Sequence, residues 1–276
     1  MPVIALLLGA LATVSPFLGL LLMQTSCRSL ILRYEAKPMG VALLWLVFPL
    51  LFATFFHRQQ DSLGIASDAF FGTGLVAFVY LYSIVKLGKP PVALTHGVIL
   101  LIIYGAVRFF LFGPQLTAAH DQAINEMNKL VPQMMQMAET KRSMALMRSL
   151  LPASWTLAQL SALTAGHMIF LQLKGSKSIL REFRLPTYYN LFILAVLPLY
   201  FFPQLRGILL NTLLPLCFLP LVQGIGVILN WFSRLASNAF VTVIVIVLAV
   251  FNLILVALLG FADIWLDFRK LRIKGI

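Results

Sequence analysis

The sequence predicts an all-α protein: a polytopic helical membrane protein of about eight transmembrane helices, with an amphipathic helical hairpin outside the bilayer. Of its 276 residues, 61% are hydrophobic and only 11% are charged, whereas soluble domains carry roughly 25% charged residues. The apolar residues fall in blocks of roughly 17–26, the length at which an α-helix crosses the hydrocarbon of a bilayer. Between these blocks lies one polar, helix-forming stretch, residues 114–150.

The apolar blocks set the expected order of the membrane helices. The first two could form one bent helix or two short ones, because Ser15-Pro16 interrupts the helical hydrogen-bond ladder between them. The first block resembles a signal peptide, but it lacks a basic n-region and the apolar pattern resumes at once, so we expect it to be retained. The blocks lie near residues 3–14, 17–32, 39–56, 64–86, 92–112, 152–173, 187–203, 206–232 and 236–265.

Basic residues between the blocks predict which loops are cytoplasmic. The clusters within 28–37, 86–89 and 174–184 are separated by even numbers of predicted spans, so all three belong on the cytoplasmic side. Three apparent spans then separate the third cluster from the basic tail at 269–274, which would place the tail outside. Because residues 206–232 contain two prolines, we expect a broken or re-entrant segment there and a cytoplasmic C-terminus.

The polar stretch 114–150 divides the chain into three parts: N-terminal membrane helices (1–113), a surface or extracytoplasmic hairpin (114–150) and C-terminal membrane helices with a basic tail (151–276). Apolar residues recur in it at steps of three or four, which predicts an amphipathic hairpin. Its methionines could bind Cu(I) together with His120, but methionine also lines adaptable apolar surfaces, and we favour that interpretation. The methionines in question are Met134, Met137, Met144 and Met147.

Composition and motifs exclude several classes of function. The chain lacks H-E-x-x-H, G-x-S-x-G and a phosphate-binding glycine loop, so we expect no enzyme, metal site or cofactor. The net charge of +12 comes from short clusters between apolar blocks, which indicates contacts with membrane lipids rather than nucleic acid. Cys27 and Cys217 lie far apart and form no zinc or disulfide pattern.

Polar residues inside the predicted spans are candidates for solute binding, because such groups are costly in hydrocarbon and often mark a solute path. Four of them also have a structural alternative. Asp68 could cap a helix, Arg108 could snorkel to the interface, and each histidine could bond to a neighbouring helix. The candidates are Asp68, His96, Arg108, His167 and Gln223.

Three segments carry a resemblance to a known family: SILREFRLPTYYNLF (178–192), LPLVQGIGVIL (219–229) and LLGFADIWLDFRKL (258–271). In this order they resemble the YybS-like family of uncharacterised bacterial polytopic membrane proteins. The family's membrane core is similar to the S subunits of energy-coupling-factor vitamin transporters. The resemblance therefore implies a multi-pass protein of the bacterial inner membrane that binds or helps transport a small solute, without an ATPase of its own. It also implies a transmembrane partner subunit, docked by the small residues Ala5 and Gly9.

The alternative is a non-transporting interaction or assembly protein that acts through the 114–150 hairpin and the basic C-terminus. The segment DIWLDFRK near that terminus has two interpretations. Its carboxylates could pair with basic groups of the tail or of the 174–184 loop where the chain leaves the membrane, or the segment could be a handle for a partner. The docking candidates here are Asp263, Trp265, Asp267 and Arg269.

Overall fold

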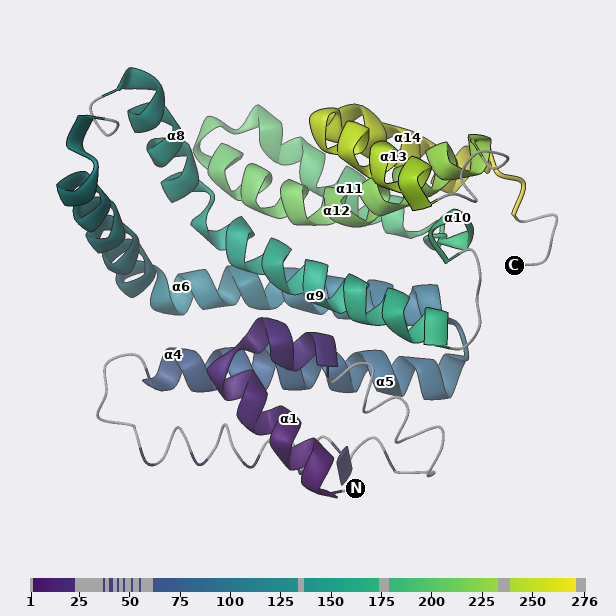
Figure 1. Ribbon diagram of the computed structural model, residues 1–276, viewed down its shortest axis with the longest axis horizontal. Helices are drawn as coiled ribbons and strands as arrows, with labels where there is room; N and C mark the ends of the chain where they lie inside the picture. The colour runs from purple at the N-terminus through teal and green to yellow at the C-terminus, as the bar shows by residue number, and fades with distance from the viewer. Residues whose placement is uncertain are drawn as a thin grey trace.

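Figure 1 shows the computed structural model, which describes residues 2–22, 62–133, 137–173, 179–232 and 239–271 and isolated positions between 37 and 55. Within these residues the chain is helical and contains no strand, which confirms the all-α prediction. Most of the predicted block 39–56 and the basic residues Arg28 and Arg33 lie outside the described part.

The N-terminal helices pack against one side of the bundle. Helix α1 (Pro2–Val14) ends at Ser15, where the predicted break occurs, and residues 16–22 resume as a second short helix. The two helices approach closely because Gly19 has no side chain: a Cβ there would lie 2.5 Å from the Cα and Cβ of Ala12. The Thr73 hydroxyl donates to the carbonyl of Pro16 at 3.3 Å and ties this segment to the bundle.

The next three helical rods form the centre of the structure. The first comprises α4 (Ser62–Ser67), the π-helical η1 (Asp68–Leu75) and α5 (Val76–Leu87) without interruption. It ends at Gly88, whose φ of 64° is a left-handed conformation that glycine adopts without steric cost. The other two are α6 (Pro90–Leu130) and α9 (Leu151–Leu173), and Figure 1 shows all three side by side.

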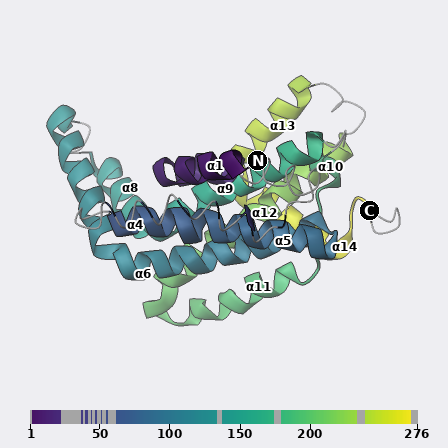
Figure 2. The ribbon, with the colours of Figure 1, turned by 90° about the horizontal axis from the view of Figure 1, so that it is seen from below.

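The predicted hairpin is built differently from the expectation. Helix α6 does not end near residue 112 but continues through Pro114 to Leu130, so a span and the first arm of the hairpin are one helix. The second arm is α8 (Ala138–Ser149), which buries no residue. An exposed ion pair joins the arms, with 2.8 Å between Arg148 Nη2 and Asp121 Oδ2, and Figures 1 and 2 show them projecting from the bundle.

The C-terminal third corrects the predicted position of a helix break. It comprises α10 (Ile179–Glu182), α11 (Tyr189–Val196), η2 (Leu197–Phe201), η3 (Pro203–Leu205), α12 (Arg206–Trp231), α13 (Ala239–Phe251) and α14 (Leu253–Leu266). Helix α12 runs unbroken through both prolines, so the re-entrant segment predicted at 206–232 is wrong. The break lies instead at Asn252, which divides the last apolar block into two short helices.

Within the described part of the chain, three helical segments are long and apolar enough to cross a membrane: Leu63–Leu87, Pro90–Leu130 and Pro203–Trp231. Two further apolar helices, Tyr189–Phe201 and Leu253–Leu266, are shorter. Their length and composition identify a helical membrane protein.

A tyrosine explains how α12 tolerates its second proline. Pro220 has no N–H, so the carbonyl of Leu216 one turn earlier loses its usual helical donor. The hydroxyl of Tyr189, which is fully buried, donates to this carbonyl at 2.9 Å. Helix α11 thereby supplies the hydrogen bond that the sequence of α12 removes.

Replacing Tyr189 by phenylalanine should therefore destabilise the protein by about 1–3 kcal/mol, since it leaves the buried Leu216 carbonyl without a donor. The free energy of unfolding in mixed detergent micelles measures this effect. Tyr200→Phe is the matched control, because Tyr200 is 61% exposed. Equal stabilities of the two variants would contradict the assigned role of the Tyr189 hydroxyl.

Candidate functional site

Two of the predicted polar residues meet where η1 crosses α6. Asp68 is buried, and its carboxylate binds Arg108 side-on: Oδ1 accepts from Nε at 2.7 Å and Oδ2 from Nη2 at 2.9 Å. The Tyr104 hydroxyl donates to Oδ1 at 2.8 Å and lies 2.9 Å from the Ser67 hydroxyl. We call Ser67, Asp68, Tyr104, Arg108 and Trp155 the Asp68 centre.

Aromatic rings enclose the charged part of the Asp68 centre. The guanidinium carbon of Arg108 lies 4.8 Å from the centroid of the Trp155 ring, a cation–π arrangement. Tyr104 packs edge-on against Trp155 at 5.4 Å and stacks on Phe71 at 5.9 Å. The ion pair is thus desolvated on several sides by groups from η1, α6 and α9.

The backbone at Asp68 adopts a π-helix, a rare conformation that recurs at functional sites. Neither Ser67 nor Asp68 caps a helix, because the rod continues through both and no side-chain cap bond forms. The capping interpretation of Asp68 is therefore wrong.

Two glycines allow the helices around the centre to approach this closely. A Cβ on Gly72 would lie 2.6 Å from the Trp155 ring, and a Cβ on Gly105 would overlap the Thr156 hydroxyl. Side chains at either position would push α9 away from η1 and α6. The two glycines therefore set the distance at which Trp155 covers Arg108.

The two candidate histidines, His96 and His167, lie elsewhere in the bundle and form hydrogen bonds to α5. Nδ1 of His167 is 2.7 Å from the Tyr80 hydroxyl, and both residues are buried. Nδ1 of His96 is 2.9 Å from the Ser83 hydroxyl. Both histidines thus bond to a neighbouring helix, as their structural alternative predicted.

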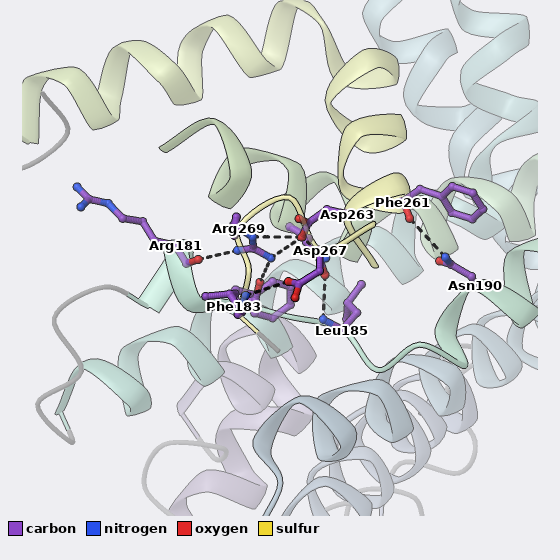
Figure 3. Close-up of polar contacts among 10 residues, drawn as sticks. Arg181, Phe183, Leu185, Asn190, Phe261, Asp263, Asp267 and Arg269 are labelled. Atoms are coloured by element: carbon purple, nitrogen blue, oxygen red, sulfur yellow. Dashed lines mark hydrogen bonds and ion pairs between the residues drawn. The ribbon is translucent and has the colours of Figure 1, made fainter. Parts of the chain in front are cut away.

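Gln223 belongs to a second buried ionic cluster, near the C-terminal end of the chain. Figure 3 labels Asp263 and Arg269 of this cluster. The carboxylate of Asp263 pairs with Arg269 at 2.7 Å, and both side chains are at most 1% exposed. Gln223 donates to Asp263 Oδ2 at 2.7 Å, and its own oxygen accepts from the Leu185 backbone N–H at 2.8 Å. We call Gln223, Asp263 and Arg269 the C-terminal clasp.

Arg269 connects the clasp to the end of helix α10 and the residue that follows it. Its Nη1 donates to the carbonyl of Arg181 at 2.6 Å, and its Nη2 to the carbonyl of Phe183 at 2.8 Å. Asp263 Oδ2 receives all three of the side-chain bonds, while Oδ1 has no partner among the described residues. Pairing of a DIWLDFRK carboxylate with the tail is confirmed for Asp263.

The remaining docking candidates have different environments. Helix α14 ends at Leu266, and Asp267 takes a left-handed conformation with φ of 48°, so the chain turns back and brings Arg269 to Asp263. Trp265 is 48% exposed. Gly9 is buried, and the side chain of Ala5 lies outside the described part. Trp265 is therefore accessible to a partner, whereas Asp263 and Arg269 are buried inside the protein.

Several members of both sites could not be singled out from the sequence. Tyr104 and Trp155 look like ordinary aromatic residues of apolar blocks, and Leu185 and Phe183 contribute only backbone atoms. The one available signal was the spacing of Tyr104 and Arg108, which are four apart and share a helical face. Among the described residues, no group of three histidine, cysteine or acidic side chains is placed to hold a metal.

The chain matches no family model, no curated protein and no solved structure. The resemblance to the YybS-like family remains a prediction from the three C-terminal segments.

Proposed function

We propose that the chain is a multi-pass subunit of the bacterial inner membrane that binds a small solute, or helps transport it, at the Asp68 centre. The observation that carries this proposal is the Asp68–Arg108 pair, whose aspartate is buried and whose arginine is mostly buried, and which joins two helices long enough to cross the membrane. Each ion of such a pair costs several kcal/mol to desolvate. A well-packed pair of apolar side chains would often stabilise the bundle equally well or better. Function therefore explains these charges better than stability does.

The proposal follows the S-subunit analogy, in which a separate transmembrane subunit would supply energy. The sequence has no Walker motif, which agrees with an ATPase on a separate subunit. The aromatic rings and the π-helical turn support a binding role, since ligand sites combine apolar walls with a few placed polar groups.

Purification from native membranes, followed by mass spectrometry of bound small molecules, tests the proposal. The double variant Asp68→Asn/Arg108→Gln removes both charges without leaving one unpaired. We expect about a tenfold or greater loss of the co-purifying molecule relative to the unmodified protein. The matched control is Asp121→Asn/Arg148→Gln, which neutralises the exposed pair of the hairpin. Equal recovery from both double variants would contradict binding at the Asp68 centre.

A second candidate function, a membrane interaction or assembly protein, is favoured by the exposed apolar side chains of the hairpin. Leu130 is 81% exposed, Leu146 is 56% exposed and Met147 is 64% exposed, although the hairpin projects beyond the bundle. The same purification examines this function through its protein fraction. A stoichiometric partner that is lost when these three residues become serine, together with no bound solute, would favour the second function.

A further inference from the structure

Arg108 keeps one edge of its guanidinium group free. Nε and one hydrogen of Nη2 are used by Asp68, whereas Nη1 donates to no atom of the described residues. Because the guanidinium is planar, the edge formed by Nη1 and Nη2 faces away from a carboxylate that is bound side-on. The Asp68 centre therefore presents two parallel N–H donors that its own residues do not use.

Arg108 is the more accessible member of the ion pair. The Arg108 side chain is 16% exposed and that of Asp68 is 9% exposed. Asp68 already accepts three hydrogen bonds, from Tyr104 and twice from Arg108. A solute that enters the centre thus meets unsatisfied donors before it meets an available acceptor.

The geometry of this edge selects for anions. Two parallel N–H groups match the two oxygens of a carboxylate or phosphate, and such bidentate bonds are among the strongest hydrogen bonds in proteins. An amine would instead have to displace Arg108 from Asp68.

The aromatic residues around the centre suit the remainder of such a molecule. Trp155 covers one face of the guanidinium, and Phe71 is 44% exposed beside Tyr104. We propose that the centre binds an organic anion whose carboxylate or phosphate lies on the free edge of Arg108 and whose apolar part lies on Phe71 and Trp155. This assignment rests on the proposed function and names its substrate class.

The test measures binding of three probes of similar shape to the full chain in phosphatidylcholine nanodiscs: phenylacetate, phenyl phosphate and phenethylamine. We expect the two anions to bind and the amine not to bind. Asp68→Asn should retain or strengthen anion binding, because Arg108 loses its counter-charge. Asp68→Asn/Arg108→Gln should weaken it about tenfold or more, and Asp121→Asn/Arg148→Gln should not change it.

A lipid headgroup could supply the same chemistry as a free anion. Nanodiscs that also contain phosphatidylglycerol distinguish the two sources. If this lipid competes with phenyl phosphate and the competition requires Arg108, the natural ligand is a lipid headgroup. If the lipid does not compete, the natural ligand is a free solute. Either result supports the anion assignment. Binding of phenethylamine that is lost in Asp68→Asn would overturn the anion class and leave the proposed function standing. Probe binding that neither Asp68 nor Arg108 affects would overturn both.

Discussion

Replacing Arg269 by glutamine should lower the free energy of unfolding by about 3–5 kcal/mol, because it leaves the carboxylate of Asp263 buried without its counter-charge. The Asp263 side chain is only 1% exposed, so water cannot take the place of the lost guanidinium. The substitution also removes the donors to the carbonyls of Arg181 and Phe183, and a buried acceptor without a partner costs about 1–3 kcal/mol.

The hairpin provides a matched comparison for this prediction. Arg148→Gln removes one partner from an ion pair of similar length, 2.8 Å, but there the side chains are 54% and 42% exposed. Exposed pairs contribute about 0–1 kcal/mol, so this variant should unfold almost like the unmodified protein. Denaturant titration in mixed micelles measures both. Similar losses for Arg269→Gln and Arg148→Gln would show that the C-terminal clasp is not buried in the membrane-embedded protein.

The double variant Asp263→Asn/Arg269→Gln shows how much of the loss in unfolding free energy comes from leaving one charge unpaired. Two neutral amides can still bond to each other and to Gln223. The double variant should therefore cost less than the sum of the two single variants, because contacting residues are coupled. Additive costs would mean that Asp263 and Arg269 act independently, against the geometry of the clasp.

The sequence predicted the helical class and the candidate charges, because hydropathy and rare polar residues are local signals. Asp68 and Arg108 could be named for this reason, yet their pairing could not, since it depends on how η1 packs against α6. The break in the C-terminal third was misplaced for a related reason. Proline at 220 is a strong local signal for a broken helix, but Tyr189 satisfies the freed carbonyl from another helix.

The tail illustrates a second limit of local patterns. A helical spacing places Asp263 and Asp267 on one face, but the helix ends at Leu266 and the two carboxylates have different roles. Asp267 accepts from the Leu271 backbone N–H at 3.0 Å within the turn, while Asp263 holds Arg269. The left-handed residues that make this turn are Asp267 and Lys270, so the sequence lacks the glycine that usually signals such a turn.

Replacing Gly260 by alanine should lower the free energy of unfolding by about 1–3 kcal/mol, because α12 and α14 cross at this residue with their backbones in contact. A Cβ at Gly260 would overlap the carbonyl oxygen of Pro220 and lie 2.6 Å from the backbone nitrogen of Gly224. Both obstacles are backbone atoms, so no side chain can rotate away and the two helices must separate.

Separation of α12 from α14 would also loosen the C-terminal clasp, since Gln223 lies on α12 and Asp263 on α14. Gly260→Ala should therefore weaken the effect of a second substitution, Arg269→Gln, in a double-mutant cycle. Gly207→Ala is the control, because a Cβ on Gly207 meets nothing within 4 Å and alanine favours the helix by about 0.5–1 kcal/mol. If Gly260→Ala is as stable as Gly207→Ala, the backbones of α12 and α14 do not touch, and another contact must hold the clasp closed.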